Sequence, residues 1–452
     1  MPSLPLSPPT LALLHLLAFA AGVALFRRRA PGTPATRLLA LAGIGAYAVF
    51  GFLAAEPPWP FEDFRRAYLP AGAAVLAGPE WLAAELTRGT DGFVNLPIVA
   101  WLFAPFALLP QKAAILGFSA AGVAASLLAW RLLVQALGLR GRAAWLLMFL
   151  FAASGPLHNS LREGNTSHFV LALLAGVLLS LVRGREAWAG VLLGLAILVK
   201  PPLALVGLYF LLRGRWRVCA GAATTGATAA AASLALFGWG LHVDWYRLCI
   251  APFSGGPVAA FNAQSLPALA ARLERGAAGL HDWAPSVLSP ATRLLGQTLV
   301  LLLLSATALV MLRGTQISRQ GTGPALGERT PGLELALVVS AACVVSPLSW
   351  SHYYTWMLLP AAWLLADAGP APGRAPLPLS RAGWIALALA CLPVLDLLDG
   401  ATAFSALHAR VTSSALLAGG CLMWWLLLRR HPGLARQRTA FPHPQALPHE
   451  LG

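Results

Sequence analysis

Residues 37–76 read RLLALAGIGAYAVFGFLAAEPPWPFEDFRRAYLPAGAAVL, an apolar run that ends in a compact group of charges. The run over residues 37–54 has nearly the length that a helix needs to cross a hydrocarbon layer of about 30 Å. Two acids and two arginines then follow within five positions, from Glu62 to Arg66. The stretch predicts a membrane helix followed by a polar segment at the membrane surface.

The same alternation of long apolar runs and short polar breaks covers all 452 residues. Hydrophobic side chains make up 58% of the chain, charged side chains 11%, and the mean hydropathy is +0.69. A soluble domain of this length could not bury so much apolar surface, so the sequence predicts an all-α polytopic integral membrane protein with about 11 to 13 transmembrane helices. The apolar runs cover residues 11–26, 37–54, 113–137, 218–238, 291–312, 333–346, 384–398 and 413–428.

Two shorter apolar stretches, 143–156 and 191–212, are candidates for half-helices that line a cavity. The second is interrupted by Lys200-Pro201-Pro202.

The charge distribution predicts which loops face the cytoplasm. The net charge of +15 comes from arginines dispersed over short loops, without the aromatic-interleaved basic face that would indicate a nucleic-acid partner. By the positive-inside rule, the loops at residues 27–37, 183–185, 213–217, 313–329, 373–381 and beyond 429 are cytoplasmic. The segments 56–91, 158–167, 241–285, 346–354 and 396–410 then face outside. We expect residues 1–430 to form one transmembrane domain in a bacterial plasma membrane, and residues 431–452 to be a disordered cytoplasmic tail.

Asp63 is the first candidate for a functional residue. From Asp63 to Leu76, apolar residues are spaced as on one face of a helix, which predicts an amphipathic helix at the extracytoplasmic membrane surface. A carboxylate at a helix start is often a simple N-cap, and that interpretation stays open for Asp63. Because the loop borders lipid, where a charge is costly, a role in substrate chemistry is the alternative.

Two further polar groups interrupt apolar surroundings. The stretch HNSLREGNTSH, residues 158–168, places Arg162, Glu163 and Asn165 at a turn on the outer side. They form either a solvated turn or a set of hydrogen-bonding groups for a sugar or a phosphate. Lys200, one of only two lysines, lies in the apolar stretch ILVKPPLAL, where it either snorkels to the surface or belongs to a functional site.

The last two clusters fall in the remaining outer segments. FNAQSLPALAARL, residues 261–273, contains Asn262 and Gln264 and is a weak signal on its own. In SPLSWSHYYTWMLLP, residues 346–360, the aromatic residues are typical of an interfacial belt, so that only Ser349 and His352 stand out. The five cysteines are scattered singly, which argues against a disulfide framework or a cysteine metal site.

Taken in order, these segments resemble glycosyltransferase family 87, the polyprenyl-phosphate-mannose-dependent α-mannosyltransferases of the GT-C superfold. The resemblance covers residues 61–365. The family pattern of DF followed by Tyr and AG reads here Asp63-Phe64, Tyr68 and Ala71-Gly72. Further matches are a proline-rich run at 105–110, the turn at 163–165, a GLAxxxKP segment at 194–201, an NxQS-like stretch at 262–265, and SPxSWxHH at 346–353, where Tyr353 replaces the second His.

The resemblance implies a GT-C fold and an inverting transfer of a sugar, mannose, from a polyprenyl-phosphate donor to a glycan or glycolipid acceptor on the extracytoplasmic face. It implies that Asp63 is the general base. Since no DxD-type motif is present, neither a metal nor another cofactor is expected. The residues expected to contact the substrates are Arg65, Tyr68, Arg162, Asn165, Lys200, Asn262, Gln264, Ser349 and His352, with Arg162, Lys200 and His352 near the leaving phosphate.

A transporter or lipid flippase is the competing interpretation, because a helix broken at Lys200-Pro201-Pro202 is also typical of transporters. A membrane scaffold is a third, supported only by the basic loops. A transporter would leave a polyprenyl-phosphate sugar intact, whereas a glycosyltransferase would consume it.

Overall fold

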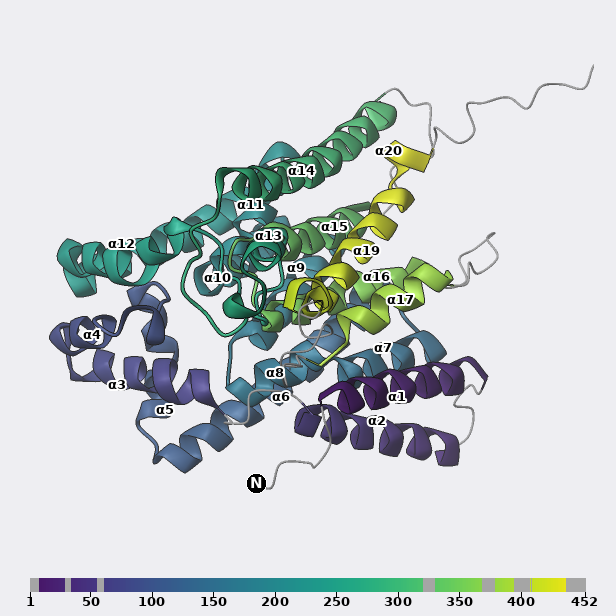
Figure 1. Cartoon of the computed structure of the whole chain (residues 1–452), viewed down its shortest axis with the longest axis horizontal. Helices are drawn as coiled ribbons and strands as arrows, with labels where there is room; N and C mark the ends of the chain where they lie inside the picture. The colour runs from purple at the N-terminus through teal and green to yellow at the C-terminus, as the bar shows by residue number, and fades with distance from the viewer. Residues whose placement is uncertain are drawn as a thin grey trace, which may run out of the picture.

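The structure is a computed structural model that describes residues 8–28, 34–54, 61–319, 330–367, 379–393, 407 and 409–435. These residues are almost entirely helical (Figure 1). The pairings of extended backbone among them are two isolated bridges, between Val258 and Pro285 and between Ala263 and Trp350. The described part of the chain is therefore all-α, as predicted. Parts of the predicted loops 27–37, 56–91, 313–329, 373–381 and 396–410 lie outside the described residues.

The helices follow the apolar runs of the sequence. In chain order, the described α-helices are α1 (Pro8–Arg28), α2 (Pro34–Ala54), α3 (Leu69–Ala77), α4 (Pro79–Leu86), α5 (Ala104–Ala107), α6 (Gln111–Leu137), α7 (Gly141–Ala153), α8 (Gly155–Glu163), α9 (Ser167–Val182) and α10 (Glu186–Val199). They continue with α11 (Ala204–Leu212), α12 (Trp216–Trp245), α13 (Leu266–Arg275), α14 (Pro290–Arg319), α15 (Thr330–Val345), α16 (Leu358–Asp367), α17 (Arg381–Ala390), α19 (Ala415–Arg430) and α20 (Pro432–Ala435).

Three of the described helices are long and apolar enough, by length and composition, to cross a membrane. They are Gln111–Leu137, Trp216–Gly255, which extends α12 through the turns that follow it, and Pro290–Gly314. Eight further apolar helices are shorter. These features are those of a helical membrane protein, and the total of about 11 to 13 crossings stays a prediction.

The core of the molecule is built around α9, against which α6, α10, α15 and α16 pack (Figure 1). Glycines let α10 and α12 come into backbone contact. A Cβ atom on Gly190 would lie 2.1 Å from the carbonyl oxygen of Val218, and one on Gly221 would lie 2.2 Å from that of Ala187. Small residues at such crossings are how apolar helices pack closely in lipid, where burial from water supplies no driving force between them.

The predicted break at Lys200 is confirmed. Helix α10 ends at Val199, Lys200 has extended backbone angles (φ −137°, ψ 88°), and a 3₁₀ turn over Pro201–Leu203 leads into α11. Proline donates no backbone hydrogen bond and disfavours helical angles in the residue before it, so the two prolines end α10 at this point. The break leaves Lys200 at the end of a buried helix.

A second buried polar cluster surrounds Glu334 of α15, at the end of α11 that lies away from Lys200. Its carboxylate accepts hydrogen bonds from the Tyr209 hydroxyl (2.8 Å) and the Arg213 guanidinium (3.0 Å from Nε), and His431 Nε2 lies 2.9 Å from it. His431 is fully buried. Of the segment 431–452, for which the sequence predicts a disordered tail, the structure describes only residues 431–435, and these include the contact of His431 with the core.

A buried arginine organises the long segment between α12 and α14. Arg272 of α13 is fully buried, and its guanidinium donates to the carbonyl oxygens of Ala260 (3.0 Å) and Ala263 and to the hydroxyl of Ser414 (2.8 Å). Arg272 has no carboxylate partner in any of these contacts, so its donors hold backbone and hydroxyl groups in place. The guanidinium thereby joins residues 259–263 to the start of α19.

We expect Arg272→Met to reduce the stability of the folded protein by about 2 to 4 kcal/mol, because it leaves buried carbonyl groups without donors. Thermal unfolding in detergent would measure the change. The control is Arg293→Met, which removes an exposed arginine of α14 and should change stability by less than about 0.5 kcal/mol. Equal midpoints for the two variants would contradict the role assigned to Arg272.

Candidate active site

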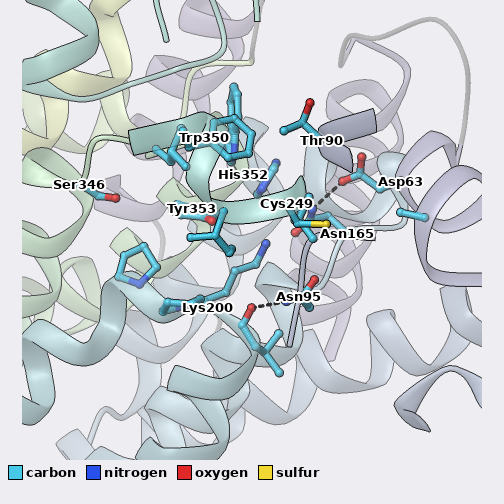
Figure 2. Close-up of a pocket in the computed structure, with 18 of the residues that line it drawn as sticks. Asp63, Thr90, Asn95, Asn165, Lys200, Cys249, Ser346, Trp350, His352 and Tyr353 are labelled. Atoms are coloured by element: carbon cyan, nitrogen blue, oxygen red, sulfur yellow. Dashed lines mark hydrogen bonds between the residues drawn. The ribbon is translucent and has the colours of Figure 1, made fainter. Parts of the chain in front are cut away.

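A cavity of about 1220 Å³ lies where α10 breaks, and polar side chains from distant parts of the sequence line it. Figure 2 shows Asp63, Asn165, Lys200 and His352 reaching this cavity from four separate segments. Asp63 precedes a π-helical turn over Phe64–Tyr68, Asn165 follows α8, Lys200 follows α10, and His352 lies in a 3₁₀ helix over Ser351–Met357. The fold therefore brings together charged groups that the sequence separates widely.

Asp63 is held by one short hydrogen bond. Asn165 donates from Nδ2 to Asp63 Oδ2 at 2.6 Å. The orientation of the amide is fixed at its other end, because Asn165 Oδ1 accepts from the amide (3.1 Å) and the hydroxyl (3.0 Å) of Ser167. The amide nitrogen therefore faces Asp63, and the second carboxylate oxygen is left for the cavity.

The capping interpretation of Asp63 is wrong. Asp63 itself has helical backbone angles (φ −59°, ψ −44°), and its side chain makes no hydrogen bond to the first turn of the helix that follows. An N-cap residue has non-helical angles and accepts from a backbone N–H two or three positions ahead. The carboxylate is instead directed across to Asn165.

Gly164 makes this approach possible. It has a left-handed conformation (φ 67°), and a Cβ atom at this position would lie 2.6 Å from Cβ of Phe64. Glycine alone avoids both the strain and the collision. The turn formed by Glu163, Gly164 and Asn165, which we call the Gly164 turn, can therefore press against the segment that carries Asp63.

Glu163 and His352 face each other at the same turn. His352 Nδ1 lies 3.4 Å from Glu163 Oε2, and both side chains are largely buried. The other ring nitrogen of His352, Nε2, is buried without a partner among the described residues. A buried ring nitrogen without a partner, in a residue that lines a cavity, is a group that a ligand can satisfy.

Lys200 supplies positive charge to the cavity. Its side chain is 6% exposed, and its Nζ lies 4.8 Å from the centre of the Tyr353 ring. Burial of a lysine ammonium is costly unless opposite charge lies nearby, and Asp63 and Glu163 both interact electrostatically with Lys200. Lys200 therefore belongs to a charged site, and the snorkelling alternative does not describe it.

Burial raises the pKa of the Asp63 carboxyl above its ordinary value, and the hydrogen bond from Asn165 and the charge of Lys200 oppose that rise. Burial also raises the pKa of Glu163 well above its ordinary value, with the charge of Asp63 as the second cause. Two neighbouring acids with raised pKa values in one cavity are typical of a site that handles protons.

The cavity brings together six of the ten residues that the sequence analysis singled out: Asp63, Tyr68, Asn165, Lys200, Asn262 and His352. The other four, Arg65, Arg162, Gln264 and Ser349, do not line it. Arg65 is exposed, and the carbonyl group of Arg162 accepts from the amide of Phe61. Gln264 donates to the carbonyl of Ser413 and accepts from the amide of Leu417, so it joins the 256–289 segment to α19.

Other residues that line the cavity include Glu163, Asn95 and Trp283, which were not among the predicted contacts. Asn95 donates to the carbonyl oxygen of Val199 at 2.8 Å and so satisfies the end of α10. In the sequence, the position of Glu163 beside Asn165 in the same turn was the feature that could have indicated its place in the site. Trp283 had no signal beyond being an aromatic residue in a polar loop.

Asp63, Glu163 and His352 each offer one ligand atom within 4.8 Å of the others, so the described part of the site has the residue types that bind a divalent cation. The same carboxylates also interact with Lys200, and Asp63 accepts from Asn165. The arrangement therefore combines a carboxylate that can accept a proton with cationic and donor groups that suit an anion.

The sequence of this chain matches the model of glycosyltransferase family 87 over residues 93–327, which is more than half of its length. The chain belongs to glycosyltransferase family 87. Its apolar helices, its charged cavity and its order of motifs are thus those of a membrane glycosyltransferase.

Two curated relatives of this family 87 chain come from Mycolicibacterium smegmatis. A polyprenol-phosphate-mannose-dependent α-(1-2)-phosphatidylinositol mannoside mannosyltransferase is 29% identical over 386 residues, which cover 79% of this chain and 80% of the relative. A polyprenol-phosphate-mannose-dependent α-(1-2)-phosphatidylinositol pentamannoside mannosyltransferase is 28% identical over 337 residues, or 72% of this chain and 74% of the relative. The similarity to each extends over most of both chains.

Proposed function

We propose that this family 87 chain is a GT-C mannosyltransferase. It transfers mannose from a polyprenyl-phosphate donor to a mannose-containing glycolipid or glycan on the extracytoplasmic face, with inversion and without a metal. The observation that carries the proposal is the Asp63 carboxylate, which is not a helix cap and is held at the cavity wall by Asn165. The donor and acceptor classes rest on the names of the two mycobacterial relatives.

In this mechanism Asp63 acts as the general base. Its carboxylate takes the proton of an acceptor hydroxyl while that oxygen attacks C1 of the donor sugar. The bond from C1 to the phosphate oxygen breaks on the opposite face, so the configuration at C1 inverts. A base with a raised pKa suits this step, and positioned proton transfer contributes roughly 10²- to 10⁴-fold in rate.

The leaving group gains charge during the reaction, because the phosphodiester monoanion departs as a phosphomonoester with the electron pair of the broken bond. Lys200 supplies positive charge, and His352 supplies Nε2 as a further donor when the proton of its neutral ring lies on that nitrogen. Burial, followed by the charge of Lys200, lowers the pKa of His352 well below its ordinary value, so the ring acts as a neutral donor, with Nδ1 3.4 Å from Glu163 Oε2. These groups take the part that a metal ion plays in nucleotide-sugar enzymes, which supports metal-independent transfer.

The arginines support an extracytoplasmic site. Arg185 precedes α10 and Lys200 follows it, so the 14 residues of this helix separate them by about 20 Å. Arg213 and Arg430 lie near the Arg185 end, in ion pairs with Glu334 of α15 and Asp367 of α16. By the positive-inside rule, the arginine-rich end is cytoplasmic, and the cavity is then at the opposite side of the membrane.

The most direct variant is Asp63→Asn. The amide keeps the shape of the side chain and still accepts the hydrogen bond from Asn165, but it cannot take a proton near neutral pH. We expect mannose transfer by the purified protein to fall by at least about a hundredfold, with the affinity for the donor nearly unchanged.

Glu80→Gln is the matched control for this variant. Glu80 of α4 is exposed and does not line the cavity, so its loss should leave transfer within about twofold of the wild type. Transfer by Asp63→Asn at the level of Glu80→Gln would show that Asp63 is not the base.

Metal independence has its own test, because Asp63, Glu163 and His352 are able to hold a divalent ion. We expect mannose transfer to be unchanged after treatment with EDTA and after later addition of Mg²⁺, Mn²⁺ or Ca²⁺, since Lys200 supplies the positive charge. Loss of transfer in EDTA with recovery on addition of one of these ions would contradict metal-independent transfer.

A further inference from the structure

The segment between α12 and α14 forms one wall of the cavity, and this wall carries an aromatic group that the proposed chemistry does not use. Phe261, Asn262 and Trp283 all line the cavity. The ring centres of Phe261 and Trp283 are 6.3 Å apart in an edge-to-face arrangement, and the Trp283 side chain remains 46% exposed. A large apolar surface is therefore displayed beside the polar site.

The indole of Trp283 has a fixed orientation. Its Nε1 donates to Asn262 Oδ1 at 3.1 Å. The residue before it, Asp282, accepts from the amide of Ala284 (3.0 Å) and from the guanidinium of Arg275 (2.9 Å). These contacts fix the ring in space even though much of it is exposed, so its surface is preorganised for a ligand.

The backbone on both sides of this wall is also anchored. The amide of Phe261 donates to the carbonyl of Leu280 at 3.0 Å, and the carbonyl of Asn262 accepts from the amide of Ser351 at 2.7 Å. These hydrogen bonds, together with those of the Arg272 guanidinium, hold the backbone around Asn262 in place. They also join it to the 3₁₀ helix that carries His352.

The cavity is large enough for two substrates. Its volume of about 1220 Å³ exceeds the range of roughly 300 to 1,000 Å³ that is usual for the site of a single drug-sized ligand. Lys200 supplies positive charge, and His352 supplies a buried ring nitrogen without a partner among the described residues, and both suit a sugar phosphate. The wall formed by Asn262 and Trp283 offers instead an aromatic face beside an amide, which suits a neutral polyol.

We propose that Trp283 and Asn262 form the acceptor subsite, in which a hexopyranosyl ring packs its apolar C–H face on the indole and accepts a hydrogen bond from the Asn262 amide. Asn262 Oδ1 is occupied by Trp283, while Nδ2 has no partner among the described residues and is the group that can donate to a sugar hydroxyl. This assignment rests on the proposed function and specifies where its acceptor binds.

An exposed tryptophan at a membrane surface can instead belong to an interfacial aromatic belt. Trp81 of α4 provides the comparison, because it is 60% exposed and does not line the cavity. Loss of an interfacial anchor should affect Trp81 and Trp283 variants alike, whereas loss of an acceptor subsite should affect only Trp283.

The experiment measures two equilibrium constants on the purified full chain: the Kd for labelled octyl α-D-mannopyranoside and the Kd for the labelled polyprenyl-phosphate mannose donor. We expect Trp283→Ala to raise the Kd for the mannoside at least about tenfold and to leave the Kd for the donor unchanged. Trp283→Phe, which keeps an aromatic face, should show a smaller increase. Trp81→Ala should match the wild type in both constants.

The proposal is overturned if Trp283→Ala binds the mannoside as tightly as the wild type and Trp81→Ala. Should Trp283→Ala lose donor binding through misfolding, Trp283→Leu takes its place, since leucine keeps an apolar side chain without a ring, and an unchanged Kd for the mannoside then overturns the proposal. Because mannoside binding is measured without turnover, the subsite is tested even if the wild type transfers no mannose, a result that would contradict the proposed function instead.

Discussion

The 2.6 Å hydrogen bond from Asn165 to Asp63 joins two segments that are about a hundred positions apart in the chain, and the geometry of the site depends on it. The bond requires the left-handed turn at Gly164, since any side chain there would collide with Phe64. It also requires Ser167 to hold the other end of the Asn165 amide. These three constraints, the hydrogen bond, the turn at Gly164 and the contacts of Ser167, thus decide where the Asp63 carboxylate lies in the cavity.

The cavity holds buried groups of opposite charge, whose positions these constraints fix. Asp63 and Glu163 are two acids in a poorly solvated place, and Lys200 is a buried ammonium at the broken end of α10. Each would be unfavourable alone, and together they partly neutralise one another. In the proposed mechanism a proton reaches Asp63 as negative charge moves onto the leaving phosphate, so negative charge is lost at Asp63 and gained near Lys200. A fixed arrangement of opposite charges lowers the cost of that exchange.

The sequence predicted those parts of the molecule that depend on composition and local backbone rules. Long apolar runs predicted helices such as α6, α12 and α14, and two prolines after Lys200 predicted the end of α10. Local patterns could not exclude a capping role for Asp63, because its backbone angles and its hydrogen bond from Asn165 are seen only in the fold. A motif also does not show whether a polar residue reaches the cavity. Gln264 lies in a family motif, but it is outside the cavity and joins two segments through hydrogen bonds to backbone groups. Trp283 lines the cavity and donates to Asn262, whose neighbours Ala260 and Ala263 accept from Arg272, and backbone carbonyls that accept from an arginine leave no pattern in a sequence.

The broken helix at Lys200 fits a transporter as well as an enzyme, so the central claim is that the donor is consumed and its sugar inverted. The most direct measurement supplies the purified protein in lipid bilayers with ¹³C-labelled polyprenyl-phosphate β-mannose and a mannoside acceptor, and determines the anomeric configuration of the product by NMR. The account predicts a new α-mannosidic linkage and the release of polyprenyl phosphate. An intact donor, moved across the bilayer or untouched, or a product with a β linkage would contradict it.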